Sequence, residues 1–204
     1  MSKNVVFDFG GVLIDWNLRY LYRSVFSDSE KMEKFLKEVF TFEANHRLDA
    51  GETFQDVIGE LQVKFPEYKE PLEAIVTRWP ETLGDEISGT VSILSRLHKQ
   101  KTPLYGLTNW SAETFPFAQE RFPFLNLFKG ITVSGEVKLA KPDPEIYLRL
   151  LADFSLNAEE CVFVDDRQDN IITAKDLGFK TVLFTEPNAL EMALEGYGIL
   201  APST

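Results

Sequence analysis

The sequence predicts an α/β protein: a parallel sheet covered by helices, with a helical segment inserted after the first strand. Two observations support this fold class. Short apolar runs alternate with helical patterns along most of the chain, which is typical of a parallel sheet with helices on both faces. The first and second apolar runs are separated by residues 10–102, and most of that segment has helical periodicity.

Five apolar runs are the candidate strands. Each run is apolar without polar alternation, so both faces of the sheet are expected to be buried. The runs cover residues 4–9, 103–109, 130–134, 161–166 and 180–184.

Helical patterns precede the second, fourth and fifth runs. Apolar residues recur on one helical face over residues 87–97, 146–154 and 171–177. Asp143 and Pro144 are typical of the first residues of the middle helix, because aspartate caps a helix and proline fits its first turn. Gly178 is typical of the residue that follows a helix.

Residues 16–84 are predicted to form a helical cap. Amphipathic patterns occur over residues 30–40, 53–65 and 72–79, and such helices bury their apolar faces against one another in a small bundle. The α/β core is therefore expected to comprise residues 1–15 and 85–204. Residues 43–54 are expected to be the most polar turn of the cap, with a loop at Asp49, Ala50 and Gly51.

Composition excludes several kinds of partner. The formal net charge is −11 and no basic cluster interrupts it, so neither nucleic acid nor an anionic membrane is an expected partner.

The first apolar run is broken by Asp8 and does not resemble a signal peptide. The single cysteine, Cys161, excludes an intrachain disulfide. We expect a cytoplasmic protein, and no pattern indicates an oligomeric state.

Polar residues that could do chemistry follow several of the predicted strands. In a parallel sheet, ligands bind at the carboxyl ends of the strands, so these side chains are expected to converge on one edge. They are Asp8, Thr108, Asn109, Lys141, Asp165 and Asp166.

This set of residues indicates phosphoryl chemistry. Three neighbouring acids cannot all stay ionised without a cation, and Mg²⁺ prefers oxygen ligands such as these. One carboxylate could attack phosphorus and form an aspartyl phosphate. A lysine, a hydroxyl and the N–H groups of a helix start could hold the phosphoryl oxygens.

Four segments in order resemble the motifs of the haloacid dehalogenase-like hydrolase superfamily, over essentially the whole chain. They are "VVFDFGG", "YGLTN", "AKPDP" and "VFVDDRQDN". The resemblance implies a Rossmann-like core with a helical cap of the C1 type. It places Asp8 at the nucleophile, Thr108 and Lys141 at phosphate-binding positions, and Asp165 and Asp166 at the acids that hold the metal.

Gly10 departs from the family pattern. Phosphatases of this superfamily typically have a second aspartate two residues after the nucleophile, which protonates the leaving oxygen and later activates water. The Gly10 carbonyl can still be a metal ligand, together with Asp8, Asp165 and Asp166. The missing side chain removes a general acid whose contribution is typically about 10²–10⁴-fold. Gly11 is expected to contact the substrate. Asn109 is expected to bond the phosphate or the neighbouring backbone, with a role at a helix start as the alternative.

Three interpretations follow. The first is a Mg²⁺-dependent phosphatase of a small phosphate ester with an easily released leaving group, such as a sugar phosphate; a branch acting on glucose 1-phosphate has the same glycine. The second is a 2-haloacid dehalogenase, but such enzymes need no metal and carry small neutral residues at the positions of Asp165 and Asp166. The third is a binding module without activity. We expect the phosphatase.

Substrate selection is expected from the cap and its border. Trp16 and Trp110 could flank the pocket or pack between cap and core. His46 and Arg47 could reach a substrate or lie on the surface, and Asp15 could line the cap hinge or form a turn.

Overall fold

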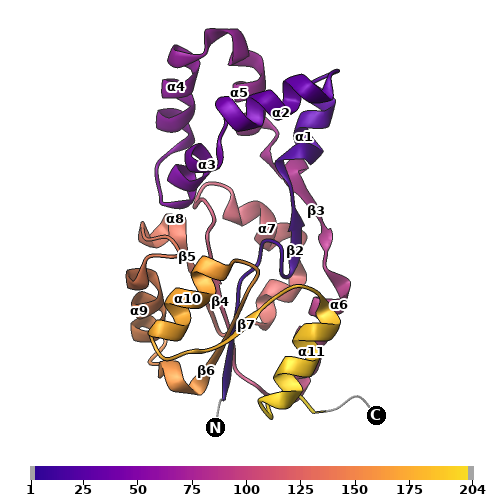
Figure 1. The fold of residues 1–204 in the computed structure, drawn as a ribbon, viewed down its shortest axis with the longest axis vertical. Coiled ribbons are helices and arrows are strands. Elements are labelled where there is room, and N and C mark those ends of the chain that lie inside the picture. Colours follow the sequence, from indigo (N-terminus) through magenta and orange to yellow (C-terminus); the bar gives the residue numbers. More distant parts are fainter. Residues whose placement is uncertain (1–2, 202–204) are drawn as a thin grey trace.

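A five-stranded parallel sheet forms the lower half of the molecule in Figure 1. The structure, a computed structural model, describes residues 3–201. The strands occur in the order β5–β4–β1–β6–β7, so β1 is central, with Val6 opposite Tyr105 of β4 and Val5 opposite Val162 of β6. All five predicted strands form: β1 (Asn4–Phe7), β4 (Leu104–Thr108), β5 (Gly130–Val133), β6 (Cys161–Asp165) and β7 (Lys180–Leu183).

Both faces of the sheet are buried, as the continuous apolar runs predict. Val5 and Phe7 pack on the face that α6 and α11 cover, whereas Val6 and Phe163 pack on the face that α9 and α10 cover. The helices of this half are α6 (Ser88–Lys99), α7 (Phe115–Arg121), α8 (Ser134–Val137), α9 (Pro144–Asp153), α10 (Gln168–Asp176) and α11 (Pro187–Gly196), with 3-10 turns at Pro123–Leu127 and Ala158–Glu160.

Helix boundaries follow the local sequence. Asp143 accepts a hydrogen bond from the Glu145 N–H and Pro144 begins α9, as predicted. Gly178 follows α10 with a φ of +93°, a left-handed conformation that glycine adopts without steric cost.

Five helices form the upper half in Figure 1. Their aromatic side chains meet at its centre, where the rings of Tyr22 and Phe35 are 4.9 Å apart and those of Phe35 and Tyr68 are 5.4 Å apart. They are α1 (Leu18–Val25), α2 (Ser29–Glu38), α3 (Phe42–Asp49), α4 (Phe54–Lys64) and α5 (Lys69–Thr77), with 3-10 turns at Pro66–Tyr68 and Trp79–Thr82.

The expected polar turn at residues 43–54 is wrong for its first part. Residues 42–49 are helical because the Thr41 hydroxyl accepts from the Ala44 N–H at 3.2 Å and caps α3. The turn is confined to the next residues, where Gly51 has a φ of +97°. Asp49 is therefore the last residue of a helix rather than part of a loop.

A short antiparallel ladder joins the two halves. It consists of β2 (Ile14–Trp16) and β3 (Leu83–Glu86), which carry the chain into and out of the five helices (Figure 1). The sequence did not predict these strands, because three or four residues are too few to show a period. The predicted domain boundaries at residues 16 and 84 fall in this ladder; the division into core and cap remains a prediction.

Cys161 is buried in β6. Within residues 3–201, no helix has both the length and the apolar character that crossing a bilayer requires.

Candidate active site

The strand order brings the predicted polar residues together. Asp8 directly follows β1, Thr108 ends β4 and Asp165 ends β6, and these three strands are neighbours in the sheet. The chain leaves β1 towards β4 and later returns to β6 on the other side. Such a reversal of strand order opens a crevice at the carboxyl ends.

Lys141 is the buried centre of the site. Its Nζ lies 2.9 Å from Asp8 Oδ1 and 2.7 Å from Asp165 Oδ2, and it donates to the Leu107 carbonyl at 2.9 Å. Lys141 is 2% exposed. Burial disfavours its charge, but the two carboxylates outweigh that effect and raise the pKa of Lys141. The ammonium group therefore stays charged beside Asp8.

Asn109 positions the loop that carries Lys141. Its Oδ1 accepts from the Lys141 N–H at 2.8 Å and its Nδ2 donates to the Lys141 carbonyl at 2.9 Å. Asn109 was expected to bond the phosphate or the neighbouring backbone, and its amide makes this double contact with the backbone. The contact indicates a positioning role.

Asp165 has both oxygens engaged by the protein. Besides the Lys141 contact, Oδ1 accepts from the Arg167 N–H at 2.8 Å, and the Asn170 Nδ2 lies 2.9 and 3.0 Å from the two oxygens. Asp165 is fully buried, whereas Asp166 is exposed. The Asp166 carboxylate is therefore more accessible to a ligand than the Asp165 carboxylate.

Ligand oxygens of Asp8, Asp165 and Asp166 lie within 4.8 Å of one another. Burial raises the pKa of Asp166, and the charge of Asp165 raises it further. Gly11 lies against this cluster with a φ of +75°, and a Cβ there would be 2.4 Å from Asp166 Oδ2. Glycine is therefore required for both the backbone conformation and the space beside Asp166.

Burial is also the main influence on Asp8. It raises the pKa of this carboxyl to about 7; Lys141 opposes the shift, and Asp165 and Asp166 add to it. Asp8 Oδ1 also accepts from the Phe9 N–H at 2.7 Å. A cation at the site would favour the ionised carboxylate.

Thr108, the last residue of β4, carries a buried hydroxyl. Among the residues that the structure describes, none forms a hydrogen bond with Thr108 Oγ1. Buried polar atoms are usually paired, so an unpaired hydroxyl here is free to donate a hydrogen bond to a ligand oxygen.

The charged residues open into a cavity of about 650 Å³ between the two halves of the molecule. Asp8, Gly10, Lys141 and Asp166 line its floor, and residues of α3 line the opposite side, including Asp49.

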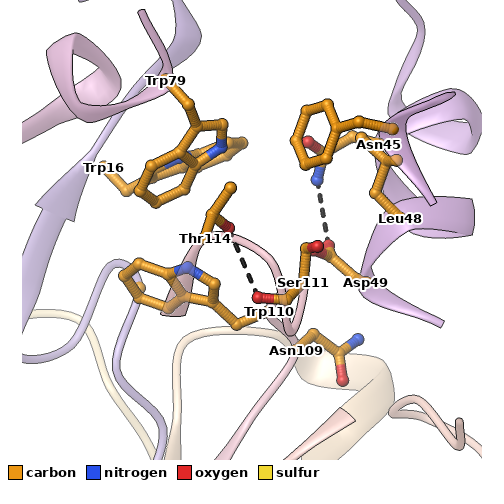
Figure 2. A pocket seen from close by; sticks show the side chains of 11 residues that line it. Trp16, Asn45, Leu48, Asp49, Trp79, Asn109, Trp110, Ser111 and Thr114 are labelled. Atoms are coloured by element: carbon orange, nitrogen blue, oxygen red, sulfur yellow. Dashed lines mark hydrogen bonds between the residues drawn. The ribbon is translucent and has the colours of Figure 1, made fainter. Parts of the chain in front are cut away.

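A smaller cavity of about 70 Å³ shares several lining residues with it; Figure 2 shows the residues that line this smaller cavity. The chain has three tryptophans, and all of them, Trp16, Trp79 and Trp110, line this cavity. The rings of Trp79 and Trp110 are 5.6 Å apart. Trp110 Nε1 is buried without a hydrogen-bond partner in the described part of the chain. The name aromatic pocket is used for this cavity below.

Asp49 borders the candidate site although its sequence context did not indicate this. It lines both the large cavity and the aromatic pocket, and its Oδ2 accepts from Asn45 Nδ2 at 2.9 Å. Burial raises the pKa of Asp49 to about 7, and the nearby charge of Asp8 adds to this effect. Its only sequence signal was an acid in the cap, which is too common to identify a site.

The remaining candidates lie in different surroundings. Arg47 pairs with Glu52 at 2.6 Å and Glu60 at 2.8 Å on the exposed side of α3, so it faces away from the cavity. His46 lines the large cavity and stacks on Phe42. Asp15 lies in β2, where it accepts from the Tyr20 hydroxyl.

The chain is similar in sequence to known hydrolases and phosphatases. Residues 5–184 match the family described as haloacid dehalogenase-like hydrolase. The chain is 28% identical to a sesquiterpene phosphatase from Aspergillus oryzae, covering 94% of each chain. It is 24% identical to the D-ribitol-5-phosphate phosphatase from Bacteroides thetaiotaomicron, covering 89% of this chain and 91% of that one.

Two solved structures illustrate the shared fold. A HAD family enzyme from Bacteroides thetaiotaomicron, in complex with magnesium and inorganic phosphate, has a TM-score of 0.70 and 24% identity, with 91% of this chain and 96% of that chain covered. The L-2-haloacid dehalogenase from Xanthobacter autotrophicus has a TM-score of 0.67 and 18% identity, with 99% of this chain and 85% of that chain covered.

Proposed function

The chain belongs to the haloacid dehalogenase-like hydrolases, and from that membership we propose that it is a Mg²⁺-dependent phosphatase of small phosphate esters. The observation that supports this most strongly is the group of ligand oxygens from Asp8, Asp165 and Asp166 within 4.8 Å of one another. A dehalogenase of this superfamily needs no metal and would gain nothing from two further acids.

Asp8 is the proposed nucleophile. Its Oδ1 is held by Lys141 and by the Phe9 N–H, which leaves Oδ2 for in-line attack. A bond forms between Oδ2 and phosphorus while the bond from phosphorus to the ester oxygen breaks, and the alcohol leaves with a proton. Water then attacks the aspartyl phosphate, which restores the carboxylate and releases inorganic phosphate.

The donor set fits Mg²⁺, because every donor is a hard oxygen and the acids outnumber the single lysine. Asp8, Asp166 and the Gly10 carbonyl would hold the ion, which supplies positive charge that neutralises the phosphoryl oxygens. Asp165 would support the ion from the same cluster, where hydrogen bonds from Lys141, Arg167 and Asn170 hold its carboxylate.

Three groups would hold the transferring phosphoryl group. Lys141 provides positive charge next to Asp8, and the unpaired Thr108 hydroxyl provides a hydrogen bond. The backbone at Gly11 approaches the ligand closely because no side chain stands there. Asn109 acts indirectly by fixing the loop of Lys141.

The organic part of the substrate would lie against the aromatic pocket. A sugar ring fits this proposal, because the C–H face of a ring packs against indole. The three indoles also suit an apolar alcohol. The named relatives represent both kinds, a ribitol phosphate and a sesquiterpene phosphate. The pocket favours compact groups because of its size, about 70 Å³.

The decisive experiment is a panel of esters assayed with Mg²⁺ and with a chelator. The panel contains p-nitrophenyl phosphate, glucose 1-phosphate, ribitol 5-phosphate and a prenyl phosphate, and Asp8→Asn is the control. We expect phosphate release that requires both Mg²⁺ and Asp8. Chloride release from 2-chloropropionate without Mg²⁺ would instead support the dehalogenase, and a folded chain that acts on none of these compounds would support a binding module.

A further inference from the structure

The position two residues after the proposed nucleophile is not filled by another side chain. A Cβ built on Gly10 meets nothing within 4 Å, and Gly10 lines both the large cavity and the aromatic pocket. The space in which phosphatases of this family place their second aspartate is therefore open. A side chain that gives a proton to the leaving oxygen would have to come from another segment of the chain.

Asp49 borders the same space from the opposite side. Together with Asn109 it lines both cavities, as Gly10 does. Figure 2 shows its side chain extending from α3 towards Ser111 and the space beside the tryptophans. A substrate with its phosphate at Asp8 and its organic part in the aromatic pocket would have its ester oxygen at the junction of the two cavities, which Asp49 lines.

The protein holds Asp49 in place at several points. The Ser134 hydroxyl, at the end of β5, donates to the Asp49 carbonyl at 2.5 Å. Asn45 donates to the carboxylate at 2.9 Å. Glu113 accepts from the Phe54 N–H at 2.9 Å and fixes the start of the following helix to the core. The end of α3 is thus attached to the sheet half of the molecule.

We propose that Asp49 is the general acid and general base that Gly10 does not provide, a role that rests on the phosphatase function proposed above. Asp49 gives its proton to the ester oxygen as the bond from that oxygen to phosphorus breaks. Asp49 carboxylate then takes a proton from water as the water oxygen bonds to phosphorus and the Asp8 carboxylate leaves. Each turnover consumes one water and returns Asp49 to its protonated form.

The electrostatic surroundings suit both steps. Burial, with a smaller contribution from Asp8, raises the pKa of Asp49 to about 7, while Lys141 lowers it. Near neutral pH both protonation states are then accessible, as an acid that also acts as a base requires. The cation Arg47 on the same helix does not pair with Asp49, because it pairs with Glu52 and Glu60. Lys138 of the α8 end packs against Gly51.

Other acids of the large cavity have different partners. Its described acidic lining residues are Asp8, Asp49, Asp166 and Asp169. Asp8 is the nucleophile and Asp166 belongs to the metal cluster. Asp169 pairs with Arg167 at 2.7 Å, which lowers its pKa and keeps it ionised. Asp49 is the acid that remains for proton transfer.

The test compares esters whose leaving groups differ in basicity. Dinitrophenyl phosphate needs no proton on its leaving oxygen, p-nitrophenyl and phenyl phosphates need increasing help, and an alkyl phosphate needs most. The variants are Asp49→Asn, Gly10→Asp and their combination. Glu43→Gln, an exposed position on the same helix, is the matched control.

We expect Asp49→Asn to lower kcat on the alkyl ester by about 10²–10⁴-fold and to leave dinitrophenyl phosphate within about tenfold. Gly10→Asp should restore much of the alkyl activity in the Asp49→Asn background, and Glu43→Gln should behave as wild type. If Asp49→Asn lowered kcat equally on every ester, or on none, the role of Asp49 would be overturned. Turnover by the wild type would still support a phosphatase in that case. A folded wild-type chain inactive even on dinitrophenyl phosphate would contradict the phosphatase function and this role together.

Discussion

Replacing Asp8 with asparagine is expected to stabilise the folded protein while it abolishes turnover. Asp8 is 7% exposed, and burial raises its pKa from an ordinary value of 3.8 to about 7. A buried carboxyl whose charged form is disfavoured costs folding free energy at neutral pH. The difference between the two pKa values, which already includes the attraction between Asp8 and Lys141, corresponds to about 4 kcal/mol.

The sign of the pH dependence follows from the same shift. Because the folded-state pKa is raised, the unfolded chain releases this proton first. The stability from the protonated carboxyl is fully present below pH 3.8 and is lost as pH rises through about 7. The stability difference between variant and wild type should therefore be larger at about pH 7.5 than at about pH 5.5, by about 2 kcal/mol.

Urea unfolding in the presence of a chelator measures this effect, with intrinsic fluorescence or circular dichroism as the signal. Glu73→Gln, which removes an exposed carboxylate in the middle of α5, is the control for a general change in net charge. Added Mg²⁺ should stabilise wild type and have little effect on Asp8→Asn. An Asp8→Asn variant no more stable than wild type at the higher pH, or a difference that does not narrow at the lower pH, would refute the account of Asp8.

Three further predictions concern the same site. Apparent Mg²⁺ affinity should rise as pH increases from about 6 to 8. Because the pKa values of Asp8 and Asp166 are raised, protons compete with Mg²⁺ for these carboxylates. Titration calorimetry in buffers of different ionisation enthalpy would detect the protons that Mg²⁺ binding releases. Gly11→Ala should cost about 1–2 kcal/mol of stability in urea unfolding, since its φ is +75°, and should weaken Mg²⁺ binding by displacing Asp166. Thr108→Val should leave the unfolding midpoint unchanged or raised, because the hydroxyl it removes is unpaired. The same variant should lower kcat about 10²–10³-fold in a phosphatase assay. An unchanged kcat would exclude a phosphate contact by Thr108.

The sheet was predictable from sequence because its strands are buried on both faces. Continuous apolar runs located all five, and the acids, the hydroxyl and the lysine that follow them converge in the structure for the topological reason given above. The ladder of β2 and β3 was not predictable, since its residues are few and only partly buried. Helix α3 was missed because its polar residues resemble a turn, and only the Thr41 cap distinguishes it.

The convergence of the candidate residues was predictable where they follow strand ends, and not where it depends on tertiary contacts. Asn109 follows β4 and was expected to bond the phosphate or the neighbouring backbone, but the sequence could not identify the Lys141 backbone as its partner. Asp49 lies far from Asp8 along the chain, and no local pattern connects them. Trp79 was not considered because it lies in a 3-10 turn far along the chain from Trp16 and Trp110, and only tertiary contacts bring it to the aromatic pocket.

The confinement of every tryptophan to one pocket makes the protein its own optical probe. Indole emission depends on local polarity and on groups that quench it, and Trp16, Trp79 and Trp110 all border the space where an organic group would enter. Emission excited at the indole band is therefore free of background from distant tryptophans. Compounds could be screened directly for occupancy of the pocket, without turnover and without a label.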